Sequence, residues 1–157
     1  MKYLLLLLIT SVASAGVPVA SVGIGKNAMY HNGTPFERAI EAGYQFEWGD
    51  FYARPEIGGF FCPGGPGNSS LYGATLFGVR ALSSVGPELH VGFGPEYLVS
   101  PDGIELSGHF QVALEGGIGI SDAKSHIGLT WRHTSNSGIE LPNLGRDFVM
   151  IQVRFYK

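Results

Sequence analysis

The feature that most restricts the fold of this chain is an alternation of apolar and polar residues with a period of two. Side chains on a β-strand point alternately to opposite faces, so this period is typical of strands with one apolar and one polar face. No window shows the 3.6-residue apolar stripe of an amphipathic helix, and 24 glycines among 157 residues would weaken helix interiors. We therefore predict an all-β protein with strands over residues 17–25, 36–48, 51–61, 71–82, 86–99, 104–120, 125–134 and 147–156.

The connections between these segments alternate in length, with 100–103 as the exception. Short turns at 49–50, 83–85 and 121–124 would lie at one end of an up-and-down meander, and the longer connections at the other. Closing such a meander into a barrel removes its exposed edges. The predicted fold is an eight-stranded antiparallel up-and-down transmembrane β-barrel, too narrow to be an open pore.

The two faces of each strand are compatible with two kinds of barrel. In segment 104–120, Phe110, Leu114 and Ile118 share one face, while Gln111 and Glu115 share the other. A soluble barrel would put the polar face in water and hold an apolar ligand inside, whereas a membrane barrel has lipid outside and a polar interior. The low charge content of 15%, the alternating loop lengths, and glutamate and arginine residues able to pair in an interior favour the membrane barrel.

The first fifteen residues, MKYLLLLLITSVASA, have the layout of a secretory signal peptide. A basic start at Lys2 precedes an apolar run too short to span a bilayer, and Ala13-Ser14-Ala15 forms an A-x-A cleavage site. We expect residues 1–15 to be a signal peptide and residues 16–157 to be the barrel domain.

Composition excludes several functions. A net charge of −3 leaves no basic excess for nucleic acid, and a single cysteine excludes a disulfide scaffold. The histidines show no ligand spacing, so no metal site is expected. By position, His90 and His109 should join an interior polar network, and His126, near a turn, should be exposed to solvent.

The stretch WRHTSNSGIELPNLGRD, residues 131–147, carries the candidate chemistry. His133 and Ser135 are two apart and follow the apolar face of segment 125–134, while Asp147 shares the apolar face of segment 147–156. Polar groups that face hydrocarbon are costly unless they satisfy one another or lie at the interface. An interpretation without catalysis remains open, in which His133 and Ser135 lie at the solvated rim of the barrel and Asp147 is a turn residue.

A hydrogen-bonded serine, histidine and aspartate would form a nucleophile, a base and an orienting acid for acyl transfer. Ser135 would attack an ester carbonyl, His133 would take its proton, and Asp147 would hold the imidazole tautomer. Donors to the oxyanion could come from Asn136, Asn143 or the backbone near Gly138. Trp131, just before them, could belong to the aromatic girdle at the membrane interface.

The segment HTSNSG from His133 to Gly138, followed by Pro142-Asn143 and Gly145, resembles the signature of the outer-membrane lipid A 3-O-deacylases. The resemblance implies that His133 and Ser135 are catalytic and that Asp147 completes the triad, at a position where the family has glutamate. It implies that Asn136 and Asn143 stabilise the oxyanion or position substrate.

The same resemblance implies the rest of the functional expectation. The fold would be an eight-stranded barrel in the outer membrane of a Gram-negative bacterium, with its site on the lipid-facing wall. The reaction would be hydrolysis of the ester-linked acyl chain at the 3-position of lipid A, without a cofactor, and a homodimer is conceivable. If both termini are periplasmic, the site lies toward the outer leaflet, where lipopolysaccharide resides.

Two other functions stay open at this point. A non-enzymatic outer-membrane barrel could use the loop over residues 135–146 to bind a partner or act structurally. A soluble secreted barrel that holds a lipid inside is the third alternative.

Overall fold

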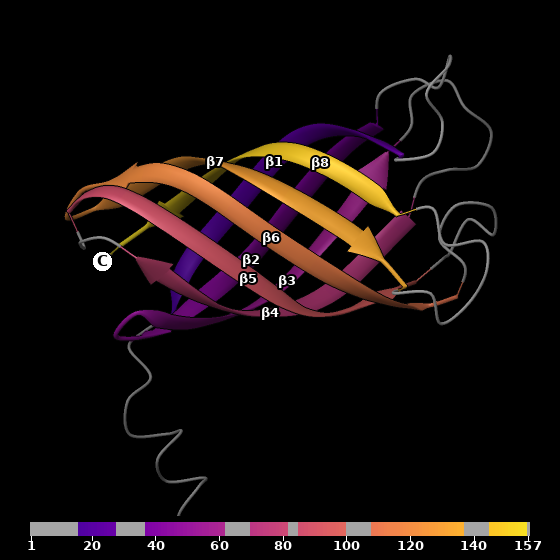
Figure 1. Ribbon diagram of the computed structural model, residues 1–157, viewed down its shortest axis with the longest axis horizontal. Helices are drawn as coiled ribbons and strands as arrows, with labels where there is room; N and C mark the ends of the chain where they lie inside the picture. Colours follow the sequence, from indigo (N-terminus) through magenta and orange to yellow (C-terminus); the bar gives the residue numbers. More distant parts are fainter. Residues whose placement is uncertain are drawn as a thin grey trace, which may run out of the picture.

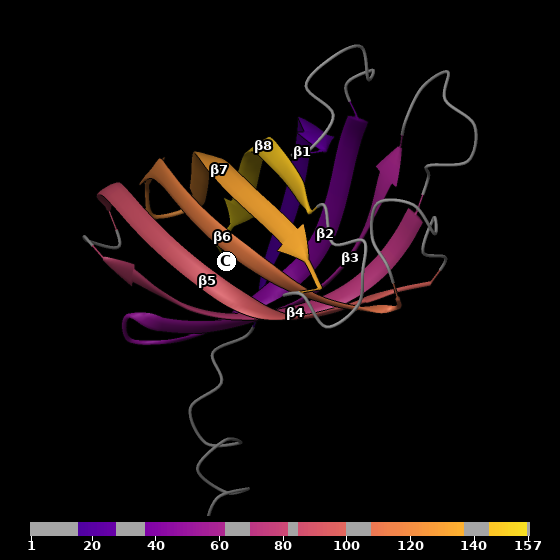
Figure 2. The same cartoon turned by 45° about the vertical axis from the view of Figure 1, so that its right-hand side comes forward.

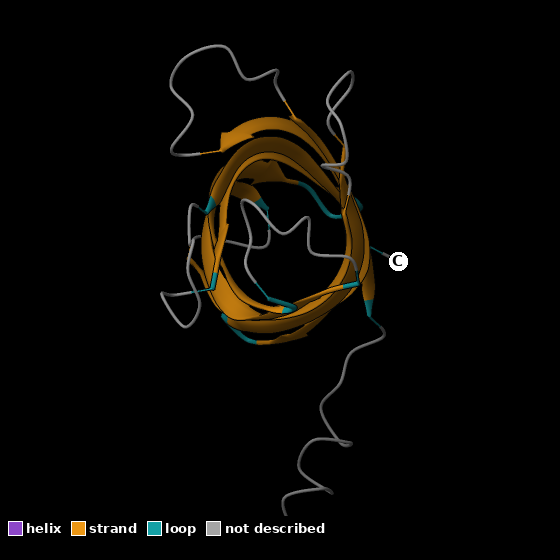
Figure 3. Ribbon diagram, turned by 90° about the vertical axis from the view of Figure 1, so that its right-hand side faces the viewer, coloured by secondary structure: helices purple, strands orange, loops and turns teal. Residues whose placement is uncertain are grey.

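The structure is a computed structural model that describes residues 16–27, 37–61, 70–81, 85–99, 108–136 and 145–156. It is a closed barrel in which every strand pairs antiparallel with its neighbours in sequence, and β1 pairs with β8 to close the ring (Figures 1 and 3). The strands are β1 (Val17–Asn27), β2 (Glu37–Trp48), β3 (Phe51–Phe61), β4 (Ser70–Ala81), β5 (Gly86–Leu98), β6 (Phe110–Ser121), β7 (Ser125–Ser135) and β8 (Arg146–Phe155). The described residues include no helix long and apolar enough to cross a membrane.

The eight-stranded barrel predicted from the sequence is confirmed, and all strand limits but one agree to within two residues. The exception is β6, which was expected to begin at residue 104 and begins at Phe110. Residues 104–107 lie outside the described residues. Gly108 has a φ of 78°, a left-handed conformation that bends the chain just before the strand.

That bend also changes the position of His109, which was expected in the interior. The side chain is exposed, its Nδ1 lies 2.7 Å from the carbonyl oxygen of Leu98, and its ring stacks on Tyr97 with centroids 5.2 Å apart. The alternation of faces starts only where extended geometry starts, so this prediction was wrong.

The outer wall of the barrel is apolar and the inside is polar. On β6, Phe110, Leu114 and Ile118 are exposed, whereas Gln111 and Glu115 are buried. The same division runs through the other strands, and it leaves large aliphatic and aromatic side chains all around the outside. This arrangement suits a barrel surrounded by lipid.

Ion pairs fill the interior. Arg54 pairs with Glu56 at 2.9 Å and with Glu115, while Arg154 pairs with Glu88. Arg132 is fully buried and pairs with three carboxylates at once. The pairing of glutamate with arginine that the sequence suggested for the interior is therefore present.

His126 was expected to be exposed, and the structure shows it fully buried in the same interior. Its Nδ1 lies 2.9 Å from Ser121 Oγ and 3.7 Å from Glu88 Oε2. Gly119 and Gly128 make room for the ring, since a Cβ atom at either position would lie within 2.7 Å of it. The prediction was wrong because nearness to a turn was given more weight than strand parity.

The antiparallel order places the ends of β1, β3, β5 and β7 at one end of the barrel, away from the C-terminus (Figure 1). At the opposite end, Asp122 organises the turn between β6 and β7. Its Oδ1 accepts the backbone N–H groups of Lys124 and Ser125, each at 2.7 Å, and these hydrogen bonds hold the pKa of the Asp122 carboxyl below its usual value. The candidate site is at the other end of β7.

Candidate functional site

β7 and β8 lie side by side in the barrel wall (Figure 2), and the register of their pairing places His133 directly opposite Asp147. Each has the parity of an apolar, outward-facing series: Leu129 precedes His133 on β7, and Val149 follows Asp147 on β8. The side chains of His133 and Asp147 are 30% and 37% exposed. The pair therefore lies on the outer wall rather than in the interior network.

A hydrogen bond of 3.0 Å joins His133 Nδ1 to Asp147 Oδ1. An ionised carboxylate can only accept hydrogen bonds, so Nδ1 of the imidazole carries the proton. In the neutral ring, Nε2 is then left with a free lone pair and can accept a proton. The aspartate, although one methylene shorter than glutamate, reaches the histidine.

Ser135 lies two residues after His133 on β7, on the same side of the strand and partly exposed. Within the described part of the chain, no hydrogen bond joins the Ser135 hydroxyl to the imidazole. Such contacts are often long without substrate and tighten when it binds. The structure thus brings His133 and Asp147 into contact and places Ser135 beside them.

The candidate oxyanion residues are only partly described. Asn136 follows the end of β7 and is 1% exposed. Gly138 and Asn143 lie outside the described residues.

Two neighbours of the imidazole were not assigned a part in the site from the sequence. Gly145 has a φ of 66°, and a Cβ at this position would lie 2.8 Å from His133 Cε1, so only glycine fits behind the ring. Trp131 Nε1 donates a hydrogen bond of 3.1 Å to Asp147 Oδ1. The sequence placed Trp131 near the site but gave no sign of this contact.

The outer wall beside the pair is hollowed. A shallow apolar groove of about 480 Å³ reaches Trp131 and Val149 and continues over β5 and β6. Gly116 faces Trp131 across the strand pair, and a Cβ atom added there would make only ordinary van der Waals contacts, the nearest at 3.9 Å.

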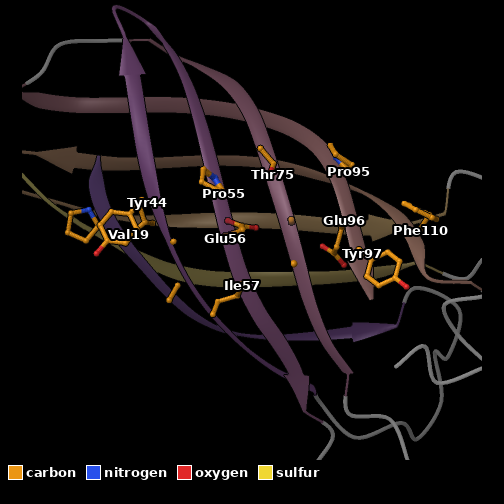
Figure 4. A pocket seen from close by; sticks show the side chains of 15 residues that line it. Val19, Tyr44, Pro55, Glu56, Ile57, Thr75, Pro95, Glu96, Tyr97 and Phe110 are labelled. Atoms are coloured by element: carbon orange, nitrogen blue, oxygen red, sulfur yellow. The ribbon is translucent and has the colours of Figure 1, made fainter. Parts of the chain in front are cut away.

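A larger hollow of about 730 Å³ lies farther round the wall, over β1 to β6 (Figure 4). None of the three candidate catalytic residues lines it. It reaches Pro95 on β5, which faces Val112 on β6, and Val112 in turn faces Ser135 on β7. Both hollows offer apolar surface to chains of a lipid.

No group of three or more side chains suited to hold a metal ion occurs among residues 16–27, 37–61, 70–81, 85–99, 108–136 and 145–156. The described side chains at the site that can take part in acid–base or nucleophilic chemistry are those of His133, Asp147 and Ser135.

The model of the lipid A 3-O-deacylase (PagL) family matches residues 20–156 of the chain. Among solved structures, the outer membrane enzyme PagL is 20% identical, with a TM-score of 0.64 over 91% of this chain and 100% of that one. The N-terminal β-barrel domain of Pseudomonas aeruginosa OprF is 11% identical, with a TM-score of 0.61 over 91% of this chain and 98% of that one. Neisserial surface protein A is 10% identical, with a TM-score of 0.58 over 89% of this chain and 95% of that one.

These structural likenesses show the fold. A comparison with curated proteins finds no match. The match to the family model spans nearly the whole barrel, including every candidate site residue. The chain belongs to the lipid A 3-O-deacylase family, whose members are outer-membrane hydrolases of Gram-negative bacteria.

Proposed function

We propose that this protein removes the ester-linked acyl chain at the 3-position of lipid A with Ser135, His133 and Asp147 as its catalytic residues. Ser135 Oγ attacks the ester carbonyl carbon while His133 Nε2 takes the hydroxyl proton. The bond between the carbonyl carbon and the sugar oxygen then breaks, and the imidazolium returns the proton to that oxygen as the alcohol leaves. Water, activated by the same imidazole, then attacks the acyl-enzyme, releases the fatty acid and restores Ser135.

The observation that carries this proposal is the 3.0 Å hydrogen bond between His133 and Asp147 on the outer wall. It selects the tautomer that a base beside Ser135 needs, and it occurs where a lipid ester can arrive from the membrane. The apolar groove next to Trp131 supports the same conclusion, because it offers a surface for acyl chains beside the reacting groups.

The proposal includes an orientation. His133 and Ser135 lie at the end of β7, the end of the barrel opposite the C-terminus. With both termini in the periplasm, that end is extracellular, and the site meets the outer leaflet that contains lipopolysaccharide. Residues 1–15, proposed as the signal peptide, lie outside the described residues, and a homodimer remains a prediction.

The oxyanion of the tetrahedral intermediate needs hydrogen-bond donors close to Ser135. Asn136 is adjacent in sequence, and we propose that it acts with Gly138 and Asn143. The match to the family signature supports this assignment, together with the position of Asn136 at the end of β7.

Labelling with a long-chain alkyl fluorophosphonate tests the nucleophile, because such reagents modify activated serines. We expect the parent protein in detergent micelles to gain one adduct, which peptide mass spectrometry locates at Ser135. Ser135→Ala and His133→Ala should each lose the label, whereas Ser125→Ala, at the other end of β7, should keep it. Heat-dependent gel mobility would confirm that each variant is folded.

The alternative outcomes have distinct meanings. Labelling of Ser135 that persists in His133→Ala would show a reactive surface serine without a base. Absence of label on the folded parent would contradict the assignment of Ser135 as nucleophile and would favour a barrel that acts by binding a partner.

A further inference from the structure

We propose that Trp131 is a positioning residue, which holds the Asp147 carboxylate in place so that it can orient His133. This inference rests on the proposed catalytic triad and adds a fourth side chain to it. It gives Trp131 a task beyond that of an aromatic residue in a membrane girdle.

The geometry centres on one oxygen atom. Asp147 Oδ1 accepts hydrogen bonds from His133 Nδ1 at 3.0 Å and from Trp131 Nε1 at 3.1 Å. An indole N–H can only donate and a carboxylate can only accept, so the direction of the second bond is fixed by chemistry. Two donors from β7 thus hold one acceptor on β8.

The register explains how the indole reaches the carboxylate. His133 is directly opposite Asp147, whereas Trp131 is directly opposite Val149. Asp147 is therefore the diagonal neighbour of Trp131, a separation that long aromatic side chains can bridge. The indole and the imidazole also stack, with centroids 6.0 Å apart and planes 21° from parallel.

A second donor matters because of where the carboxylate lies. The Asp147 side chain is 37% exposed on a wall that otherwise faces lipid, where a poorly satisfied charge is costly. With the imidazole as its only donor, the carboxylate could rotate toward water. The indole bond and the stacked ring restrict both partners to the orientation in which Nδ1 faces Oδ1.

A girdle residue and a positioning residue respond differently to the loss of one N–H group. Trp131→Phe keeps an aromatic ring at the interface and removes the donor. The expected result with purified lipid A in detergent mixed micelles is a kcat lower by about 10- to 100-fold, the range for a hydrogen bond to a charged group. KM should stay within about two-fold, because the indole N–H is directed at Asp147 and not at substrate.

The second tryptophan of the chain provides a matched control. Trp48 ends β2 at the opposite end of the barrel, and Trp48→Phe should leave kcat unchanged. Comparable heat-dependent gel mobility of both variants would separate a catalytic effect from a loss of fold. A parent-like kcat for folded Trp131→Phe overturns the proposal.

A double-mutant cycle tests whether the indole acts through Asp147. In an Asp147→Ala background, Trp131→Phe should lower kcat by less than about two-fold, since its acceptor is already gone. The same fractional loss in both backgrounds would show that Trp131 acts independently of Asp147 and would overturn the proposal. Full activity of Asp147→Ala would instead contradict the proposed triad itself, so the two failures are distinguishable.

Discussion

Arg132→Met is expected to destabilise the barrel by about 3–5 kcal/mol, the range for removing one partner of a buried ion pair. Arg132 is fully buried, and its guanidinium lies 2.9 Å from Glu41 Oε1 and 2.5 Å from Glu96 Oε2 and also pairs with Glu56. Methionine preserves apolar volume but leaves these carboxylates without their common cation. Equilibrium unfolding by urea in lipid vesicles would measure the change in free energy of unfolding.

The pair of Arg80 and Glu47 supplies the control for that experiment. Its atoms are 2.9 Å apart, but the two side chains are 17% and 14% exposed at the edge of the interior. Arg80→Met should therefore cost less than Arg132→Met, because water reaches both partners of this pair and can solvate the glutamate that is left. Equal losses in the two variants would contradict a specific role for the network around Arg132.

Asp147→Asn is expected to lower kcat by about 10⁴-fold, as when the orienting acid of a serine–histidine–aspartate triad is amidated. The amide can present its NH₂ group to the histidine, which favours the tautomer with a protonated Nε2 and removes the base. Measuring fatty-acid release from lipid A in mixed micelles would give the rate.

Asp122, near the opposite end of β7, provides a control in which the same change from carboxylate to amide is made away from the site. Asp122→Asn changes a turn between β6 and β7, far along the strand from His133, and should leave kcat unchanged. If Asp147→Asn retained parent activity, the 3.0 Å contact with His133 would have no catalytic importance.

The fold could be predicted because its signal is local and repeated. In β6, the exposed Leu114 and the buried Glu115 follow directly from a period of two. The low charge content and the available arginine and glutamate pairs then selected the polar interior, which the ion pairs of Arg54 and Arg132 confirm. Strand parity also put His133 and Asp147 on the same face of neighbouring strands.

The errors and omissions come from features that parity does not encode. The left-handed conformation of Gly108 delays the start of β6, and so His109 is exposed. His126 is the exception, because the parity of β7 does indicate burial and the error came from giving more weight to the nearby turn; glycines on two strands leave the space for its ring. The contacts of Trp131 and Gly145 with Asp147 and His133 depend on the register between β7 and β8, which the alternation of faces along each strand does not determine.

Ser135 is the residue that we propose makes this barrel a lipid A deacylase. The most direct test of this proposal is mass spectrometry of lipid A from Gram-negative cells that produce either the parent protein or Ser135→Ala at matched outer-membrane levels. We expect the parent to remove one acyl chain from the 3-position and the variant to leave lipid A intact. Unchanged lipid A in cells with folded parent protein, or equal deacylation by both proteins, would contradict the proposal.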